Sequence, residues 1–194
     1  MMGVVLCGGR GSRLGGEDKA SLVRGGRSLL EHAADALAGC VAIVAVGDER
    51  SGPDRLIWTT ESPRFGGPAA GLLAGVHKGV AALTDAPTWV AALAVDMPLV
   101  TPDTFRRLRA ACTDDGAVLV DGEGQRQHLC AIYRVSALLS KAPDDPSGMP
   151  LGRLLDGLKI APVAALDAEA RDVDVDADLR RTGVDRPDPD TRQG

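Results

Sequence analysis

Aromatic residues are scarce in this chain of 194 residues, which contains two Trp, one Tyr and two Phe. So few rings, combined with a formal net charge of −5, argue against an extended nucleic-acid surface, which needs cations and stacking side chains. No apolar run approaches the roughly 20 residues of a membrane span, and the N-terminus lacks the charged and apolar regions of a signal peptide. We therefore expect a cytoplasmic protein with neither a membrane nor a nucleic-acid partner.

Paired cysteines are also missing, since none of the four cysteines belongs to a C-x-x-C motif. Their wide spacing predicts neither a zinc site nor the disulfide framework of a secreted protein. We expect them to be reduced core residues: Cys7, Cys40, Cys112 and Cys130.

What the chain does have is an ordinary globular composition, with 44% hydrophobic and 25% charged residues. This length and composition predict a single domain with a substantial core. The last ten residues, DRPDPDTRQG, show no apolar periodicity. We therefore expect one domain over residues 1–184 and a disordered tail over residues 185–194.

A glycine-rich segment follows the first apolar run of the chain. Residues 4–7 have the length and composition of a buried strand, which stops at Gly8-Gly9. The small residues that follow allow the backbone to approach a ligand closely and to point N–H groups at it. Residues 10–27 contain five Arg or Lys against two acids. This local reversal of charge in an acidic chain predicts a bound polyphosphate.

Two common phosphate-binding motifs do not fit this segment. A Walker loop requires G-x-x-x-x-G-K-[ST], but the pair Gly11 and Gly16 is followed by Glu17. The dinucleotide fingerprint G-x-G-x-x-G fails because Leu14 occupies the position of its last glycine.

The segment GGRGSRLGGEDKASL resembles the signature loop of the small nucleotidyltransferases, most closely that of the molybdenum cofactor guanylyltransferases. Leu14 stands where that family usually has Met. Four separated motifs of the family occur in the same order over residues 3–182. The matching positions of the first motif are Gly8, Gly9, Ser12, Arg13, Gly15, Asp18, Lys19 and Leu22.

Apolar runs alternate with helical patterns along the rest of the chain. This alternation predicts an α/β fold with a largely parallel sheet, whose ligand binds at the carboxyl ends of the strands. Ser28 with Glu31 forms a capping-box pattern at the start of the first helix. Strands are expected at residues 41–46, 55–58, 89–95, 117–120, 128–133 and 159–166, and helices at 29–37, 102–112 and 151–158, with a further helix that runs through Val80.

The strand at residues 89–95 is the most apolar in the chain and ends in Asp96-Met97-Pro98. A carboxylate at the end of a central strand lies where the ligand should be, and oxygen donors suit a Mg²⁺ ion that also holds phosphates. The alternative is an N-cap or turn aspartate before Pro98. Asp96-Met97-Pro98 also resembles the metal-binding motif of the family.

A second glycine-rich stretch, SPRFGGPAAGLLAG, resembles the family segment that recognises the base and ribose. The alternative is a loop followed by a small-residue helix that packs on the sheet. In the family an acid often precedes this segment, and Glu61 is the nearest candidate.

Further along the chain, DG and HLCAIYR resemble a family segment near the acceptor substrate, which makes Asp121, Gly122, His128 and Arg134 candidates for substrate contact. A lone histidine in a strand is, however, more often structural. Residues 142–150 are expected to form an exposed loop over the acceptor site.

The acidic stretch at residues 172–179 alternates acids with small or apolar residues, as an acidic surface strand leading into a capped helix would. On such a strand Asp172, Asp174 and Asp176 share one face. The stretch also resembles a late element of the family, in which Asp174 would be a second metal ligand, although Ala177 replaces the usual Pro.

The resemblance implies a three-layer, Rossmann-like fold that transfers GMP from GTP to molybdopterin or the molybdenum cofactor and releases pyrophosphate. Mg²⁺ is the implied cofactor, held by Asp96 and Asp174, with Lys19, Arg13 and Asp96 as catalytic residues. A molybdoenzyme or a cofactor-insertion protein would receive the product. The implied nucleotide contacts are Leu6, Gly8, Gly9, Gly11, Ser12, Arg13, Lys19, Gly47, Glu61, Gly67 and Pro68.

Two alternatives remain open from the sequence. The same loop and metal site would serve a cytidylyltransferase or a sugar-phosphate nucleotidyltransferase. In a different class, the protein would be a nucleotide-binding regulator without catalysis, but a binder would not need both Lys19 and Asp96.

Overall fold

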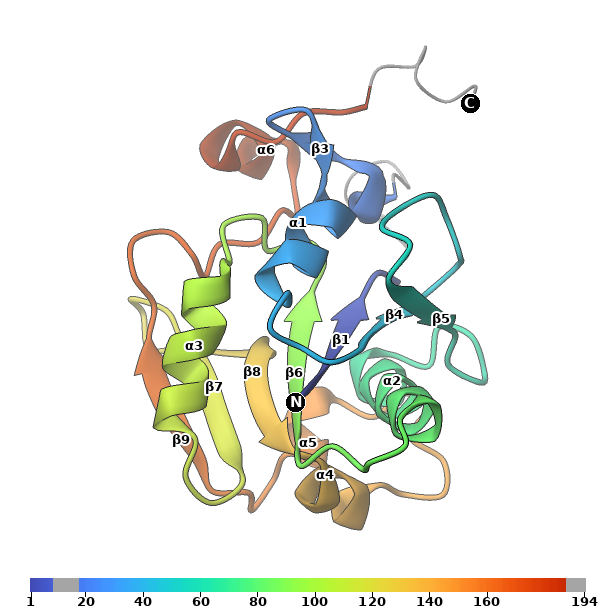
Figure 1. Ribbon diagram of the computed structural model, residues 1–194. Coiled ribbons are helices and arrows are strands. Elements are labelled where there is room, and N and C mark those ends of the chain that lie inside the picture. The colour runs from blue at the N-terminus through green and yellow to red at the C-terminus, as the bar shows by residue number, and fades with distance from the viewer. Residues whose placement is uncertain (9–17, 188–194) are drawn as a thin grey trace.

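The computed structural model describes residues 1–8 and 18–187, which form a central sheet with helices on both faces (Figure 1). The sheet has seven strands in the order β5-β4-β1-β6-β8-β7-β9. Only the two pairs that involve β8 are antiparallel, with β6 and with β7. The strands are β1 (Met2–Leu6), β4 (Ile43–Val46), β5 (Leu56–Thr59), β6 (Trp89–Ala94), β7 (Gly116–Val120), β8 (Arg126–Arg134) and β9 (Ile160–Ala164).

The helices divide between the two faces of the sheet and complete three layers (Figure 1). One face carries α1 (Leu29–Ala36) and α3 (Pro102–Ala111), and the other carries α2 (Pro68–Ala82), α4 (Val135–Lys141) and α5 (Leu151–Leu154). The strands alternate between these two cores: in β1, for example, Val5 faces the first and Val4 the second. This confirms the predicted α/β fold with a mostly parallel sheet.

The sequence did not predict the 3-10 turn η2 (Lys19–Ser21) or the short hairpin that follows it near the carboxyl edge of the sheet. The hairpin consists of β2 (Val23–Arg24) and β3 (Arg27–Ser28) and leads into α1. It contacts the segment that follows α6 (Asp176–Thr182), because Val23 and Asp185 exchange backbone hydrogen bonds of 2.8 and 2.7 Å. The expected disordered tail therefore does not begin at Asp185, which is paired; residues 188–194 lie outside the described residues.

Glycines allow α2 to lie very close to the sheet. A Cβ atom at Gly75 would lie 2.5 Å from Cγ1 of Val4, and one at Gly79 would lie 2.0 Å from Cε of Met2. Both positions therefore need glycine for packing. The close contact places the start of α2, at Gly67 and Pro68, next to the carboxyl ends of β1 and β4.

The four cysteines are all free thiols, as predicted, but only Cys7 and Cys130 are buried in the core, whereas Cys40 and Cys112 are partly buried. Burial raises the pKa of Cys7 to about 12, against a smaller lowering effect of Arg50. In the described part of the chain, no helix is long and apolar enough to span a membrane.

The predicted capping box at the start of α1 is present. The hydroxyl of Ser28 accepts from the amide of Glu31 at 3.2 Å, and a Glu31 carboxylate oxygen accepts from the amide of Ser28 at 2.7 Å. We expect Ser28→Ala to lower the free energy of unfolding by about 1 kcal/mol, measured by urea denaturation. The matched control is Ser140→Ala, because that exposed hydroxyl bonds only the carbonyl of Ala137 within its own helix. Equal effects of the two variants would contradict the capping role.

Candidate active site

The carboxyl ends of the parallel strands meet at one edge of the sheet. β1 ends in register with both β4 and β6, where Leu6 pairs with Val46 and with Ala94. β5 ends beside β4 at Thr59. The segments that follow these strands therefore lie together, and they carry most of the residues that the sequence singled out.

Lys19 lies between two carboxylates at this edge. Its Nζ donates to Oδ2 of Asp96 at 2.7 Å and to Oδ1 of Asp174 at 2.5 Å. Partial burial by itself lowers the pKa of Lys19, but the charges and hydrogen bonds of the two acids outweigh burial, and the pKa is raised. The structure thus brings together three residues that the sequence analysis had proposed from three separate motifs.

The local structure around Lys19 explains how its side chain is held in place. Lys19 begins the 3-10 turn η2, which Asp18 caps by accepting from the amide of Ala20 at 3.1 Å. Leu22, directly after the turn, is fully buried in the core beneath α1. Arg50 forms an ion pair with Asp18 and stacks over the ring of Trp58 at 5.9 Å. The sequence analysis did not identify Arg50 as a support of this turn.

Asp96 and Asp174 are joined through the backbone as well as through Lys19. The amide of Val173 donates to the carbonyl of Asp96 at 2.9 Å, and Val173 is fully buried. On the other side, Asp178 of α6 accepts from the amides of Asp174 and Val175 at 3.1 and 3.0 Å. The segment bearing Asp174 is therefore fixed at both ends.

The predicted acidic strand at residues 172–179 is wrong. Val173 is buried, and its amide donates to the carbonyl of Asp96, so residues 172–175 do not add a strand to the sheet. The helix α6 begins at Asp176. Asp176 instead forms a surface ion pair with Arg186 at 2.7 Å. Partial burial, followed by the nearby charges of Asp174 and Asp96, raises the pKa of Asp172. Asp172, Asp174 and Asp176 therefore do not lie side by side on one face of a strand, and each has different neighbours.

The donor set suits a divalent cation. Asp96 and Asp174 already converge on one positive charge, the ammonium of Lys19, and carboxylate oxygens are the ligands that Mg²⁺ takes. Across residues 1–8 and 18–187, no group of three or more His, Cys, Asp or Glu side chains is placed to hold a metal. The arrangement therefore fits a cation that shares two carboxylates of the protein with oxygens from the substrate.

Several of the residues expected to contact nucleotide lie at the same edge of the sheet as this centre. A Cβ at Gly47, where φ is +147°, would lie 3.4 Å from the amide nitrogen of Gly8, so the turn after β4 borders the entry to the first glycine-rich segment. Gly67 precedes α2 with φ of +90°, and Pro68 is the first residue of that helix. Leu6 packs against the N-terminal half of α2, where a Cβ at Gly71 would lie 3.1 Å from its Cδ2.

Glu61 has a local structural role. Its Oε1 accepts from the amide of Phe65 at 3.0 Å, and Phe65 has a positive φ of 61°. Glu61 thus stabilises the bend that leads into Gly66 and Gly67, so its contact with nucleotide stays a prediction. Gly9, Gly11, Ser12 and Arg13, which were predicted to bind phosphate, lie outside the described residues.

The four residues predicted to contact the acceptor substrate lie at two opposite edges of the sheet. Asp121 follows β7 at the carboxyl edge and stabilises its own turn, which contains Gly122, by accepting from the amides of Glu123 and Gln125, both at 2.9 Å. His128 lies near the same edge, and its Nδ1 is buried without a hydrogen-bond partner among the described residues. Burial and Arg126 lower the pKa of His128.

The expected substrate contact of Arg134 is wrong for a geometric reason. Because β8 is antiparallel to β6, its last residue, Arg134, pairs with Trp89 at the opposite edge of the sheet from Asp96. The guanidinium lies over the Trp89 ring at 4.4 Å and donates to the carbonyl of Asp114 at 2.8 Å.

Comparisons with known proteins identify relatives of this chain. A family model described as a MobA-like NTP transferase domain matches residues 3–159. A molybdenum cofactor guanylyltransferase of Cereibacter sphaeroides is 38% identical over 142 residues, covering 70% of each chain. One from Vibrio cholerae is 30% identical over 150 residues, covering 71% of this chain and 70% of the other. The family match ends before Asp174, so this match does not cover the contact of Asp174 with Lys19 that the structure shows.

Solved structures share the fold at low sequence identity. Molybdopterin-guanine dinucleotide biosynthesis protein A from Archaeoglobus fulgidus superposes with a TM-score of 0.67 at 20% identity, covering 94% of this chain and 97% of the other. The 2-C-methyl-D-erythritol 4-phosphate cytidylyltransferase of Thermus thermophilus gives a TM-score of 0.64 at 18% identity, covering 93% and 96%. The fold is therefore shared by enzymes that use different bases and acceptors.

Proposed function

The chain belongs to the family of MobA-like NTP transferase domains, and from that premise we propose that it transfers GMP from GTP to molybdopterin or the molybdenum cofactor. The products would be the guanine dinucleotide form of the cofactor and pyrophosphate. The observation that carries the proposal is the Lys19 ammonium held between Asp96 and Asp174 at the carboxyl edge of the sheet. Two relatives at 30% and 38% identity that bear the name molybdenum cofactor guanylyltransferase support the choice of substrates.

The proposed reaction is a displacement at the α-phosphorus of GTP. A phosphate oxygen of the acceptor forms the new bond to this phosphorus, while the bond to the oxygen that leads to the β-phosphate breaks, and pyrophosphate leaves with that electron pair. A phosphate monoester with a second pKa of about 6 is already an oxyanion at neutral pH, so the attacking oxygen needs no general base. The protein has mainly to position the groups and to stabilise developing negative charge.

The residues of the site fit these tasks. Lys19 would move from the carboxylates to the phosphates, where its charge stabilises the leaving pyrophosphate. Arg13 and the amides of Gly8 and its neighbours would hold the triphosphate. Mg²⁺, when bound by Asp96 and Asp174, would neutralise phosphate charge and fix the geometry for in-line attack. The stretch at Gly67 and Pro68 would contact the base and ribose.

We predict that pyrophosphate release with Mg²⁺ requires both GTP and molybdopterin, and that GTP binds more tightly than CTP, ATP or UTP. The assay measures pyrophosphate from each nucleotide with and without molybdopterin, and calorimetry measures nucleotide binding. Equal or tighter binding of CTP would favour a cytidylyltransferase. Nucleotide binding without pyrophosphate release under any combination would indicate a non-catalytic regulator. If the transfer occurs as proposed, the product would pass to a molybdoenzyme or to a cofactor-insertion protein.

A further inference from the structure

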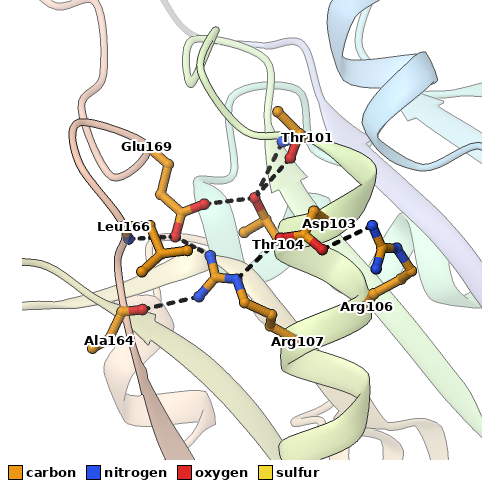
Figure 2. A network of polar contacts seen from close by, with 8 residues as sticks. All are labelled: Thr101, Asp103, Thr104, Arg106, Arg107, Ala164, Leu166 and Glu169. Carbon is orange, nitrogen blue, oxygen red and sulfur yellow. Dashed lines mark hydrogen bonds and ion pairs between the residues drawn. The ribbon is translucent and has the colours of Figure 1, made fainter.

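A buried carboxylate, Glu169, lies outside the site and joins α3 to the segment that follows β9 (Figure 2). Glu169 is only 8% exposed. Its Oε2 accepts from the hydroxyl of Thr104 at 2.7 Å, and its Oε1 accepts from the amide of Leu166 at 2.8 Å and pairs with Arg107. Burial alone would raise the pKa of Glu169, but these donors, Arg107 first, outweigh it and lower the pKa. Glu169 is therefore held as a carboxylate.

Thr104 connects Glu169 to the segment that carries Asp96. Thr104 is fully buried, and its hydroxyl also accepts from the amide of Thr101 at 3.2 Å. Thr101 ends the short connection that starts at Asp96 and leads into α3. One hydroxyl thus anchors the Asp96 connection and donates to Glu169 at the same time.

Glu169 belongs to the segment that carries Asp174. This segment leaves β9 at Ala164, whose carbonyl accepts from Arg107 at 3.0 Å. Directly before Asp174, the amide of Val173 donates to the carbonyl of Asp96. The two acid-bearing segments are therefore joined twice. One junction is the backbone hydrogen bond beside the acids, and the other is the buried contact between Thr104 and Glu169.

Stability alone gives little reason for this second junction. Glu169 also forms an ion pair with Arg107. A buried ion pair can often be replaced by apolar residues of similar volume without loss of stability, because removing both charges from water is costly. What the polar contact supplies is a fixed geometry, and residues that orient metal-binding side chains commonly have that role.

We propose that Thr104 and Glu169 are positioning residues, whose hydrogen bond holds the Asp174 segment against the Asp96 segment so that both carboxylates face one cation. The inference rests on the proposed function, since it concerns the cation site of that reaction. Neither residue touches Lys19, Asp96 or Asp174 through a hydrogen bond or ion pair in the described structure. Their effect is therefore transmitted through the two segments.

A matched pair of variants at one position tests this. Thr104→Val keeps the shape of the side chain but removes the hydroxyl, which leaves the amide of Thr101 and Oε2 of Glu169 without this partner. Thr104→Ser keeps the hydroxyl and loses only a methyl group. We expect Thr104→Val to raise the Mg²⁺ concentration for half-maximal pyrophosphate release by about 10-fold, with an unchanged KM for GTP at saturating Mg²⁺. Thr104→Ser should remain near the wild-type values.

A binding measurement without turnover accompanies the kinetics. Mn²⁺ bound to the protein is measured from the loss of the electron paramagnetic resonance signal of free Mn²⁺. Thr104→Val should weaken Mn²⁺ binding by a factor similar to its effect on Mg²⁺ dependence, and Thr104→Ser should not. Glu169→Gln, which keeps the shape but removes the charge, should shift both readouts in the same direction as Thr104→Val and decides the question if Thr104→Val does not fold.

Arg106→Ala is the control from the same helix, because Arg106 is 76% exposed and pairs only at the surface with Asp103 (Figure 2). The proposal is overturned if Thr104→Val merely lowers the melting temperature while it binds Mn²⁺ as tightly as Thr104→Ser. If the wild-type protein releases no pyrophosphate from GTP, the proposed function fails, and the Mn²⁺ comparison still decides the positioning role.

Discussion

Asp96→Asn lowers the rate of pyrophosphate release by about 10³-fold, because a bound cation supplies several kcal/mol of charge stabilisation and about 1.4 kcal/mol corresponds to a tenfold rate. The fold should survive. The backbone carbonyl of residue 96 still accepts from Val173, and the side-chain amide oxygen of Asn can still accept from Lys19. Steady-state kinetics and thermal unfolding measure the two effects separately.

Variants of the late acids provide the controls for Asp96. Asp174→Asn should weaken Mg²⁺ dependence more moderately, since Asp174 is the more exposed of the two carboxylates that hold Lys19. Asp176→Asn should have no effect on Mg²⁺ dependence, because Asp176 is a surface residue paired with Arg186. Should Asp174→Asn behave like Asp176→Asn, the metal would be held by Asp96 and substrate alone.

Lys19→Met is expected to lower kcat by about 10²- to 10³-fold, the usual loss when one donor to developing charge is removed. KM for GTP should change much less, because a cation directed at the leaving group acts mainly in the transition state. The matched control is Lys78→Ala, which removes an exposed lysine from α2.

A second effect of Lys19→Met follows from its two carboxylate partners. In the wild-type protein a divalent ion has to compete with the Lys19 ammonium for Asp96 and Asp174. The variant leaves these two carboxylates without that cation, so Mg²⁺ should raise its melting temperature more than it raises that of the wild type. A variant that raised only KM for GTP and kept kcat would instead make Lys19 an anchor for bound substrate.

Asp96 could be found from the sequence because its signals are local. A strand of uncharged residues buried on both faces has to lie in the middle of a sheet, and the carboxylate after it has to lie at the edge where ligands bind. Lys19 was likewise identified within its own motif. The contact of both residues with Asp174 has no local signal, because Lys19 and Asp174 are separated by 155 positions.

The sequence was misleading where a local pattern fits two structures. Alternation of acids with small residues at 172–179 fits a strand, but the buried Val173 amide and the cap from Asp178 favour an irregular turn before α6. A resemblance of sequence says nothing about which end of a strand a residue occupies. Arg134 was assigned to the site from the family resemblance of HLCAIYR, although the antiparallel pairing of β8 places it at the opposite edge from Asp96. Glu169 had no sequence signal, because its partners come from α3.

The tie between the hairpin after Lys19 and the last described residues has a consequence during protein synthesis. Arg24 donates to the carbonyl of Thr182, and Val23 pairs with Asp185, so the segment that presents Lys19 is completed by residues that are made much later than Lys19 itself. Asp174 is also synthesised on the order of ten seconds after Asp96. A nascent chain can form β1 early, yet it cannot complete the proposed cation site until Asp174 and the residues that pair with the hairpin have also been made.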